Sequence, residues 1–391
     1  MRKLLLALGL TMMACGGEKT PPPPVPDDLS VGESALQDQL RLLWAERVFY
    51  SRALMISTLH GLGDRDLLSA RLRQNNSDLG AAFDAFYSSV GAGAQIATYL
   101  DTDQNHLEAA LNTASVRGDL GKEKRPWKDN IKALTKYLKS INSELPGSLD
   151  NYLDDYIDNA FNQIQQRHVA DWVDDVNALD RSVKNANKLA DDFTEGFLKQ
   201  YPDHVTKEPN PRYQTLRTDQ RKLWMDHLMW HHFYNLSTVN SLPDVIACEQ
   251  RTLLNPTDLG NSFKPYYGSL EGEQFSAMLR EHMLNSARLV HYVLMDDQTS
   301  VVTTKAIGFG NADQIAQFLS NLNENLPLEV TRPNMFHHQQ LVYDDIDAQF
   351  AGDFAAELRT LEEFEAHLLE TADAISSATQ AKYPDQLSPK Q

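Results

Sequence analysis

The chain has 391 residues, with 54 acidic against 36 basic side chains, a formal net charge of -18 and a pI near 5.0. So acidic a chain disfavours nucleic acid and anionic lipid surfaces as partners, because both require a basic face. Hydrophobic residues make up 42% of the sequence, which is enough for ordinary cores. The length after the N-terminal segments, about 360 residues, suits two domains.

The first residues have the layout of an export signal. Two basic residues precede an apolar run at 4–10 that is too short to span a bilayer as a helix, and Ala14 leads to Cys15. This pattern resembles a bacterial lipoprotein signal. The resemblance implies removal of a signal peptide at 1–14, acylation of Cys15 and a lipid anchor in the cell envelope, at the outer membrane in a Gram-negative host. The alternative is an ordinary signal peptide with an incidental cysteine.

A proline-rich stretch follows, with four consecutive prolines at 21–24. Such a run favours an extended polyproline II conformation, so residues 15–33 are predicted to form a tether. Cys248 is the only other cysteine. With Cys15 acylated no intrachain disulfide can form, the absence of a Cys-x-x-Cys-His motif excludes covalent haem, and Cys248 is expected to be a buried small side chain.

Helical periodicity dominates the rest of the chain. Ser34 and Gln37 fit a capping box that begins a helix ending near residue 60. A short helix near 64–73, a loop at 75–77 and a second short helix come next. Further helices are expected at 92–115, 126–143, 149–166, 168–200, 217–240, 243–253, 257–268, 271–295, 309–325, 333–350 and 353–382. The best strand candidate is 301–304, and Pro333 is expected to mark a helix start.

The sequence also contains an internal duplication. Residues 43–87 recur at 223–267 with a constant offset of 180 and no gap, and weaker matches continue to the end of each copy. The predicted fold class is all-α, with two tandem antiparallel helical bundles at 34–203 and 217–385. A linker at 204–216 joins them, and a tail at 386–391 follows the second.

Histidines are distributed unequally between the copies. Of the 12 histidines, eight lie in the second copy. His227 and His231 are four residues apart and therefore share a helix face. Two other helices each bring one histidine to an apolar face, His282 and His338. The sequence thus suggests a metal site inside the second bundle, built from these four imidazoles.

The candidate ions for this site are Zn, Fe, Cu and Mn. The candidate outer-shell residues are Asp226, Glu281 and His337. The alternative is that these histidines are hydrogen-bonded core or groove residues. The His-Glu-x-x-His motif of zinc proteases and the paired Glu-x-x-His motifs of di-iron bundles are absent from the sequence, as is any recognisable catalytic triad or phosphate loop.

The first copy does not repeat the candidate ligands. Arg47 and Ser51 occupy the positions of His227 and His231. The position of His282 corresponds to Thr102 or Asp103, and that of His338 to Asp155 or Tyr156. Any chemistry is therefore expected in the second copy, with a charged cluster around Glu46, Arg47 and Asp155 in its place in the first.

The second copy resembles an uncharacterised family of bacterial helical-bundle proteins. The residues that carry the resemblance are Leu223-Trp224, His227, Asn255-Pro256, Pro265-Tyr266-Tyr267-Gly268, Glu281-His282, Asn311-Ala312-Asp313 and His338. The resemblance covers most of 217–385 and, more faintly, 37–203. It implies a helical bundle and supplies no activity.

Three functional hypotheses follow. The first is a lipid-anchored envelope protein with a binding or structural role and a histidine metal site in its second bundle. The second is a metal-dependent enzyme with its site in the same bundle. The third is a helical scaffold for envelope protein partners. The sequence favours a non-enzymatic role and gives no substrate.

Overall fold

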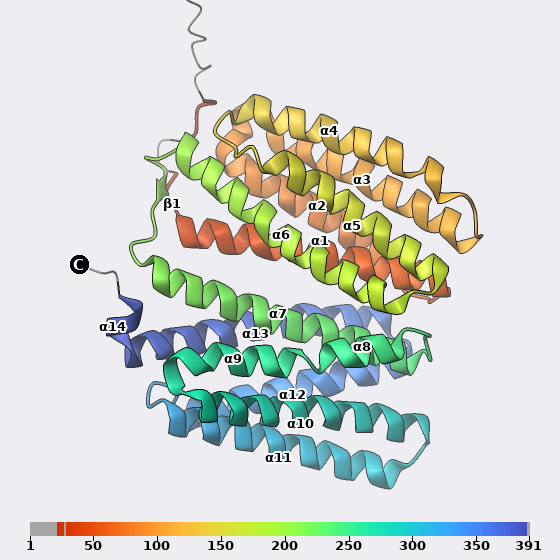
Figure 1. Ribbon diagram of the computed structural model, residues 1–391, viewed down its shortest axis with the longest axis vertical. Helices are drawn as coiled ribbons and strands as arrows, with labels where there is room; N and C mark the ends of the chain where they lie inside the picture. Colours follow the sequence, from red (N-terminus) through yellow and green to blue (C-terminus); the bar gives the residue numbers. More distant parts are fainter. Residues whose placement is uncertain (1–21, 27–28, 389–391) are drawn as a thin grey trace, which may run out of the picture.

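The computed structural model describes residues 22–26 and 29–388, and these form an all-α protein of two helical bundles, as predicted (Figure 1). The first bundle comprises α1 (Glu33–His60), α2 (Arg65–Tyr87), α3 (Ala92–Ser115), α4 (Lys124–Ile141), α5 (Leu149–Val169) and α6 (Trp172–Gln200). The second comprises α7 (Pro211–Val239), α8 (Val245–Thr252), α9 (Asn255–Tyr267), α10 (Ser269–Leu294), α11 (Gln298–Leu322), α12 (Leu328–Ala351), α13 (Phe354–Lys382) and α14 (Pro384–Leu387). Within the described residues none of these helices is long and apolar enough to cross a membrane.

The start of the first bundle differs from the sequence-based prediction. The N-cap of α1 is Gly32, and the hydroxyl of Ser34 donates to Glu208 instead of capping the helix. The predicted capping box is therefore wrong. Val31–Gly32 (β1) pairs in parallel with Val205–Thr206 (β2), in a two-stranded contact that joins the beginning of the first bundle to the chain leaving it.

Helix α2 is continuous where a loop at 75–77 was predicted. Asparagine is a weak helix former because its side chain competes for backbone groups. Here both asparagines are buried and bonded to other helices: Asn75 Nδ2 donates to Leu43 O at 2.9 Å, and Asn76 Nδ2 donates to Asp101 Oδ1 at 2.8 Å. Tertiary hydrogen bonds therefore override the local preference. In the second copy a proline follows the equivalent asparagine, and the chain is divided there into α8 and α9.

Two further predictions in the second copy are wrong. Residues 301–304 form part of α11, which begins earlier than predicted because the carboxylate of Asp297 accepts from the backbone N–H of Ser300 at 3.1 Å. Pro333 lies inside α12 instead of at its start. The predicted linker 204–216 also contains the first residues of α7, whose N-cap is Asn210.

The described part of the proline run contacts the first bundle. Ser89 Oγ donates to Pro24 O at 3.1 Å, and the Tyr201 hydroxyl donates to Pro23 O at 3.1 Å. This part of the predicted tether therefore packs on the protein. Cys15 and the predicted signal peptide lie outside the described residues.

The duplication is visible in equivalent contacts between helices. A Cβ atom placed on Gly80 would lie 2.4 Å from the carbonyl oxygen of Gly93, and one on Gly260 would lie 2.4 Å from that of Gly272. The α2–α3 and α9–α10 pairs therefore approach each other closely through glycines at matching positions.

Two asparagines repeat the next packing step. Asn130 Nδ2 donates to Tyr99 O at 3.0 Å, and Asn311 Nδ2 donates to Met278 O at 3.2 Å. These contacts fix α4 on α3 and α11 on α10 in the same register. They allow residues of the two copies to be matched in space as well as in sequence.

Replacing Gly260 with alanine is expected to lower the free energy of unfolding by about 1–3 kcal/mol, because the added methyl group forces α9 and α10 apart. The matched control is Gly310→Ala in α11, where a Cβ atom meets no neighbour within 4 Å. That change should stabilise the helix by about 0.5–1 kcal/mol. Urea unfolding of both variants measures the contrast, and equal effects would contradict the close approach.

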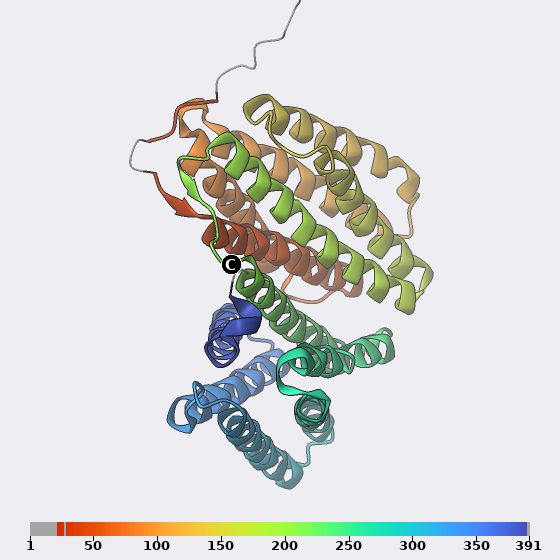
Figure 2. The same ribbon diagram turned by 60° about the vertical axis from the view of Figure 1, so that its left-hand side comes forward.

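The bundles pack through α1 and α7, which lie side by side between the other helices in both views (Figure 1, Figure 2). Phe49 of α1 stacks on Phe233 of α7 with ring centroids 5.1 Å apart. Two ion pairs cross the interface at equivalent places. Arg71 Nε lies 2.8 Å from Glu362 Oε1, and Arg251 Nε lies 2.7 Å from Asp180 Oδ2. The interface is thus approximately symmetric.

Candidate metal centre

Three of the four predicted ligands meet inside the second bundle. His227 on α7, His282 on α10 and His338 on α12 each offer a ring nitrogen within 4.8 Å of the other two. Their exposed fractions are 0%, 2% and 5%. The Nε2 atoms of His282 and His338 are 3.3 Å apart. Two imidazole nitrogens at about 2.0–2.1 Å from a tetrahedral zinc ion are separated by about 3.3 Å. The spacing therefore suits shared coordination.

Two amide side chains orient these rings. His227 Nδ1 lies 3.1 Å from Asn255 Oδ1, and the amide of Asn255 is itself fixed because its Nδ2 donates to Leu223 O at 2.9 Å. His282 Nδ1 lies 3.1 Å from Gln339 Oε1. Each Nδ1–H donates to its amide oxygen, which leaves the Nε2 lone pair free for a metal. Metal-bound histidines in proteins are usually held by such a hydrogen bond on the second nitrogen.

Among residues 22–26 and 29–388, several buried ring nitrogens at this place have no hydrogen-bond partner. They include His227 Nε2 and His338 Nδ1. A buried polar atom without a partner costs about 1–3 kcal/mol, so native proteins rarely contain several together. A cation at the centre of the cluster would satisfy His227 Nε2 and remove the conflict between the two facing Nε2 atoms.

The local electrostatics keep the cluster uncharged. Burial lowers the pKa of His227 to about 3, aided by the neighbouring His282 imidazole. Burial likewise lowers the pKa of His282 to about 4, and it holds the pKa of His338 well below its usual value, with the other imidazoles adding to the effect. Neutral imidazole is the form that binds metals. At neutral pH the imidazoles of the cluster are therefore in the protonation state that can coordinate a cation.

His231, the fourth predicted ligand, lies beside the three. It is buried, its ring centroid is 5.7 Å from that of His282, and its Nε2 atom has no partner in the described part of the chain. Its nitrogens are not among those that approach within 4.8 Å of the other three ligands. A fourth ligand from this residue requires a rotation of its side chain.

The predicted outer-shell residues have other partners. Asp226 accepts from Lys222 Nζ at 2.7 Å, the half-exposed Glu281 pairs with Arg288, and the half-exposed His337 pairs with Glu363. Asn255 and Gln339 hold the rings instead. Sequence reasoning assigned neither of them this role, although Asn255 is one of the residues shared by the two copies.

Sequence reasoning also missed two buried histidines of the second bundle. His367 on α13 has its ring centroid 5.7 Å from that of His338, and no described residue provides a partner for its Nε2 atom. Burial lowers its pKa to about 4, with His337 adding to the effect. His232 belongs to a separate cluster at the bundle interface.

Cys248 is fully buried, as predicted, and burial raises the pKa of its thiol to about 12.

The equivalent place in the first bundle holds an ionic cluster. Arg47 takes the position of His227, and it pairs with Asp103 and with the Tyr156 hydroxyl, which lies 2.9 Å from Arg47 Nε. Tyr156 also donates to Asp103 Oδ2 at 3.1 Å. Asp103 and Tyr156 are therefore the counterparts of His282 and His338. The predicted charged cluster is present, with these two residues in place of Glu46 and Asp155.

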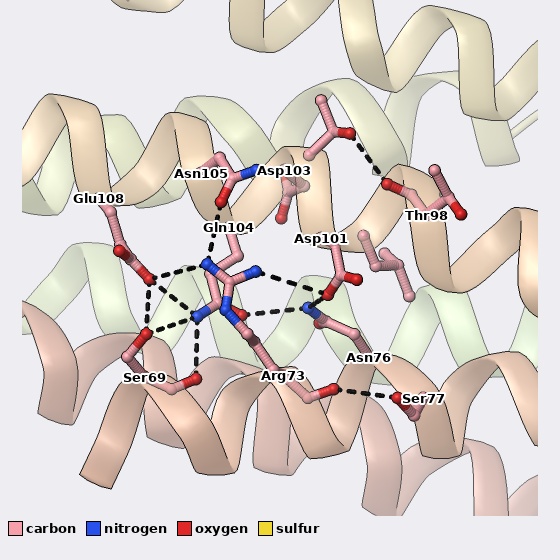
Figure 3. Close-up of polar contacts among 12 residues, drawn as sticks. Ser69, Arg73, Asn76, Ser77, Thr98, Asp101, Asp103, Gln104, Asn105 and Glu108 are labelled. Atoms are coloured by element: carbon pink, nitrogen blue, oxygen red, sulfur yellow. Dashed lines mark hydrogen bonds and ion pairs between the residues drawn. The ribbon is translucent and has the colours of Figure 1, made fainter. Parts of the chain in front are cut away.

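A polar network around Asn76 completes the cluster of the first bundle. Asn76 on α2 also accepts from Arg47, and its amide reaches across to α3, where Asp101 and Gln104 accept from it (Figure 3). Trp127 Nε1 donates to the second oxygen of Asp103. This cluster combines opposite charges and many hydrogen bonds, so its buried polar atoms have partners among the described residues. Several ring nitrogens of the imidazole cluster do not.

The likeness of the second copy to an uncharacterised bacterial family remains a prediction. No family profile, curated protein or solved structure matches this chain.

Proposed function

We propose that this chain is a lipid-anchored envelope protein whose second bundle binds one transition-metal ion through His227, His282 and His338. The observation that supports it is the convergence of three neutral, buried imidazoles from three helices, two of them oriented by amide oxygens with Nε2 directed inward. Among the candidate ions, imidazole ligands suit Zn, Cu and Fe, whereas Mn favours oxygen ligands.

The burial of the ligands supports a binding or structural role over catalysis. A catalytic metal keeps an open position for water or substrate. Here the three ligands are at most 5% exposed. The ion would link α7, α10 and α12, which come from distant parts of the second copy. It would therefore stabilise the bundle.

Titration of chelator-treated protein with Zn²⁺ tests this proposal. We expect one ion per chain and a rise in unfolding free energy of about 2.7 kcal/mol when free Zn²⁺ is 100 times the dissociation constant. His282→Ala should abolish both effects. The matched control is His291→Ala, which removes an exposed imidazole from the same helix. Absence of stoichiometric metal, with no stabilisation by Zn²⁺, Cu²⁺, Fe²⁺ or Mn²⁺, would contradict the proposal.

Replacing Cys15 with serine is expected to abolish lipid labelling and membrane fractionation, because the acyl anchor requires the cysteine sulfur. Labelling of cells with a radioactive fatty acid, followed by fractionation, measures both. Cys248→Ala is the control, since it removes the only other thiol. If the serine variant stays in the membrane fraction, the proposed anchor is wrong.

A further inference from the structure

A second buried cluster lies where the two bundles meet. His232 on α7 places Nδ1 3.3 Å from Asp345 Oδ1 and Nε2 3.8 Å from Glu357 Oε1. Gln349, one turn after Asp345 on α12, donates from Nε2 to Asp345 Oδ2 at 3.2 Å. All four side chains are buried, and the histidine and both carboxylates offer ligand atoms within 4.8 Å of one another.

The first bundle contributes a third carboxylate. Asp64, which precedes α2, is 7% exposed and lines a cavity of about 10 Å³ together with His232 and Glu357. This volume is close to that of one water-sized sphere, and Asp345 and Gln349 lie outside its lining. The cluster therefore combines groups from both bundles.

The approximate symmetry of the interface gives this cluster a counterpart. Arg52 takes the place of His232, and its Nη2 lies 2.6 Å from Asp175 Oδ2. Arg167 Nη1 lies 2.8 Å from both Asp175 Oδ2 and Asp244 Oδ2, the latter from the second bundle. These residues are at most 5% exposed. Two arginines thus face two aspartates, and the counterpart is electrically neutral.

The register of the helices supports this correspondence. The carboxylate of Asp171 caps α6 by accepting from the backbone N–H three residues later, and Asp353 caps α13 in the same way. This offset of 182 pairs Asp175 with Glu357. It also pairs Arg167 with Gln349.

The second cluster lacks this charge balance. Both arginines are replaced, one by His232 and the other by the neutral Gln349, while the carboxylates number three. Even with His232 protonated, the three carboxylates leave an excess of two negative charges. Buried charge without a counter-charge is strongly unfavourable.

The amide of Gln349 lies against this group of carboxylates. Gln349 is 7% exposed; its Nε2 faces the cluster, and among the described residues its Oε1 has no partner. A rotation that exchanges the two amide atoms would turn Oε1 towards a cation in the cluster, which would supply both positive charge and a partner for this oxygen.

We propose that this cluster is a second cation site, which takes a hard divalent ion such as Mn²⁺ and connects the two bundles. Asp345, Glu357 and one nitrogen of His232 are the ligands, with Gln349 Oε1 and Asp64 completing the oxygen-rich surroundings. Carboxylate and carbonyl oxygens suit Mn²⁺, whereas the three-imidazole cluster suits Zn²⁺. With His232 neutral, as a ligand must be, the three carboxylates carry three negative charges, and one divalent ion reduces this excess to one.

Mn²⁺ binding to full-length, chelator-treated protein, followed by electron paramagnetic resonance, tests this second site. We expect one Mn²⁺ per chain in the native protein and also in His338→Ala, which alters only the imidazole cluster. The double variant Asp345→Asn, Glu357→Gln should bind Mn²⁺ at least tenfold more weakly. Asp344→Asn is the matched control, because it removes one exposed carboxylate from the same helix.

Stability measurements keep the test decisive if a variant folds poorly. Without metal, the double variant should have a midpoint of thermal unfolding equal to or above that of the native protein, because it loses uncompensated buried charge. With excess Mn²⁺ only the native protein should gain stability. Failure of the native protein to bind Mn²⁺, or equal binding by the double variant, would overturn the second site. Neither outcome affects the Zn²⁺ result for His282→Ala.

Discussion

Replacing Arg47 with methionine is expected to lower the free energy of unfolding by about 3–5 kcal/mol, the usual cost of leaving a buried charge without its partner. Arg47 is 0% exposed, and Asp103 is 1% exposed. The remaining donors to Asp103, Tyr156 and Trp127, provide hydrogen bonds but no positive charge. Chemical denaturation of the variant measures the loss.

The neighbouring Arg73 provides the matched control. It lies 3.8 Å from Asp101 and 3.6 Å from Glu108, and its side chain is 42% exposed (Figure 3). Exposed ion pairs contribute about 0–1 kcal/mol, so Arg73→Met should have a small effect. The double variant Arg47→Met, Asp103→Leu should recover part of the stability that Arg47→Met loses, because no buried charge remains. Similar losses for Arg47→Met and Arg73→Met would contradict this account of the first bundle.

Acidification is expected to destabilise the metal-free protein through its buried imidazoles. The pKa of His338 in the folded state lies below its ordinary value of 6.5, chiefly because of burial. Below about pH 6.5 the unfolded chain binds a proton that the folded protein does not. The contribution of His338 to the free energy of unfolding is therefore fully present above that pH. It decreases by about 1.4 kcal/mol for each pH unit below it.

The His338→Leu variant isolates this effect. Between pH 6.5 and 5 the native protein should lose more stability than the variant, by about 1.4 kcal/mol per pH unit. The control is Val342→Ala on the same helix, which removes buried carbon atoms but no titratable group. Urea unfolding in the presence of a chelator gives the curves. Parallel curves for the native protein and His338→Leu would show that His338 is not buried in its neutral form.

Most of the fold could be predicted from the sequence because the helices are amphipathic and the two copies support each other. The bounds predicted for α3, 92–115, coincide with the structure. Errors arose where tertiary contacts outweigh local preference. Asn75 and Asn76 continue α2 because other helices supply partners for their side chains. The segment 301–304 is β-branched, yet it forms part of a helix that packs against two others.

The candidate site was predictable in part. Helical spacing placed His227, His282 and His338 on inward faces, and the structure brings them together. The amide partners could not be assigned, because their role depends on how the helices rotate against each other. His232 follows His231 directly, so periodicity directed it away from the imidazole cluster. Its partners Asp345 and Glu357 meet it only through the folding of the second bundle.

The two bundles thus have one framework and different interiors. In the first, arginine and aspartate compensate each other at both buried polar positions. In the second, His227 and His232 occupy the positions of Arg47 and Arg52, Gln349 occupies that of Arg167, and no arginine balances the buried carboxylates near His232. His227 occupies the position of Arg47 and His232 that of Arg52, so each proposed cation site lies where the first bundle has a buried arginine.

X-ray absorption at the zinc edge of protein loaded with one equivalent of Zn²⁺ tests the central claim most directly. The account predicts at least three imidazole nitrogens at about 2.0–2.1 Å from the ion. His282→Ala should lose this signal. A spectrum dominated by water or carboxylate oxygens, unchanged by His282→Ala, would contradict a metal centre at His227, His282 and His338.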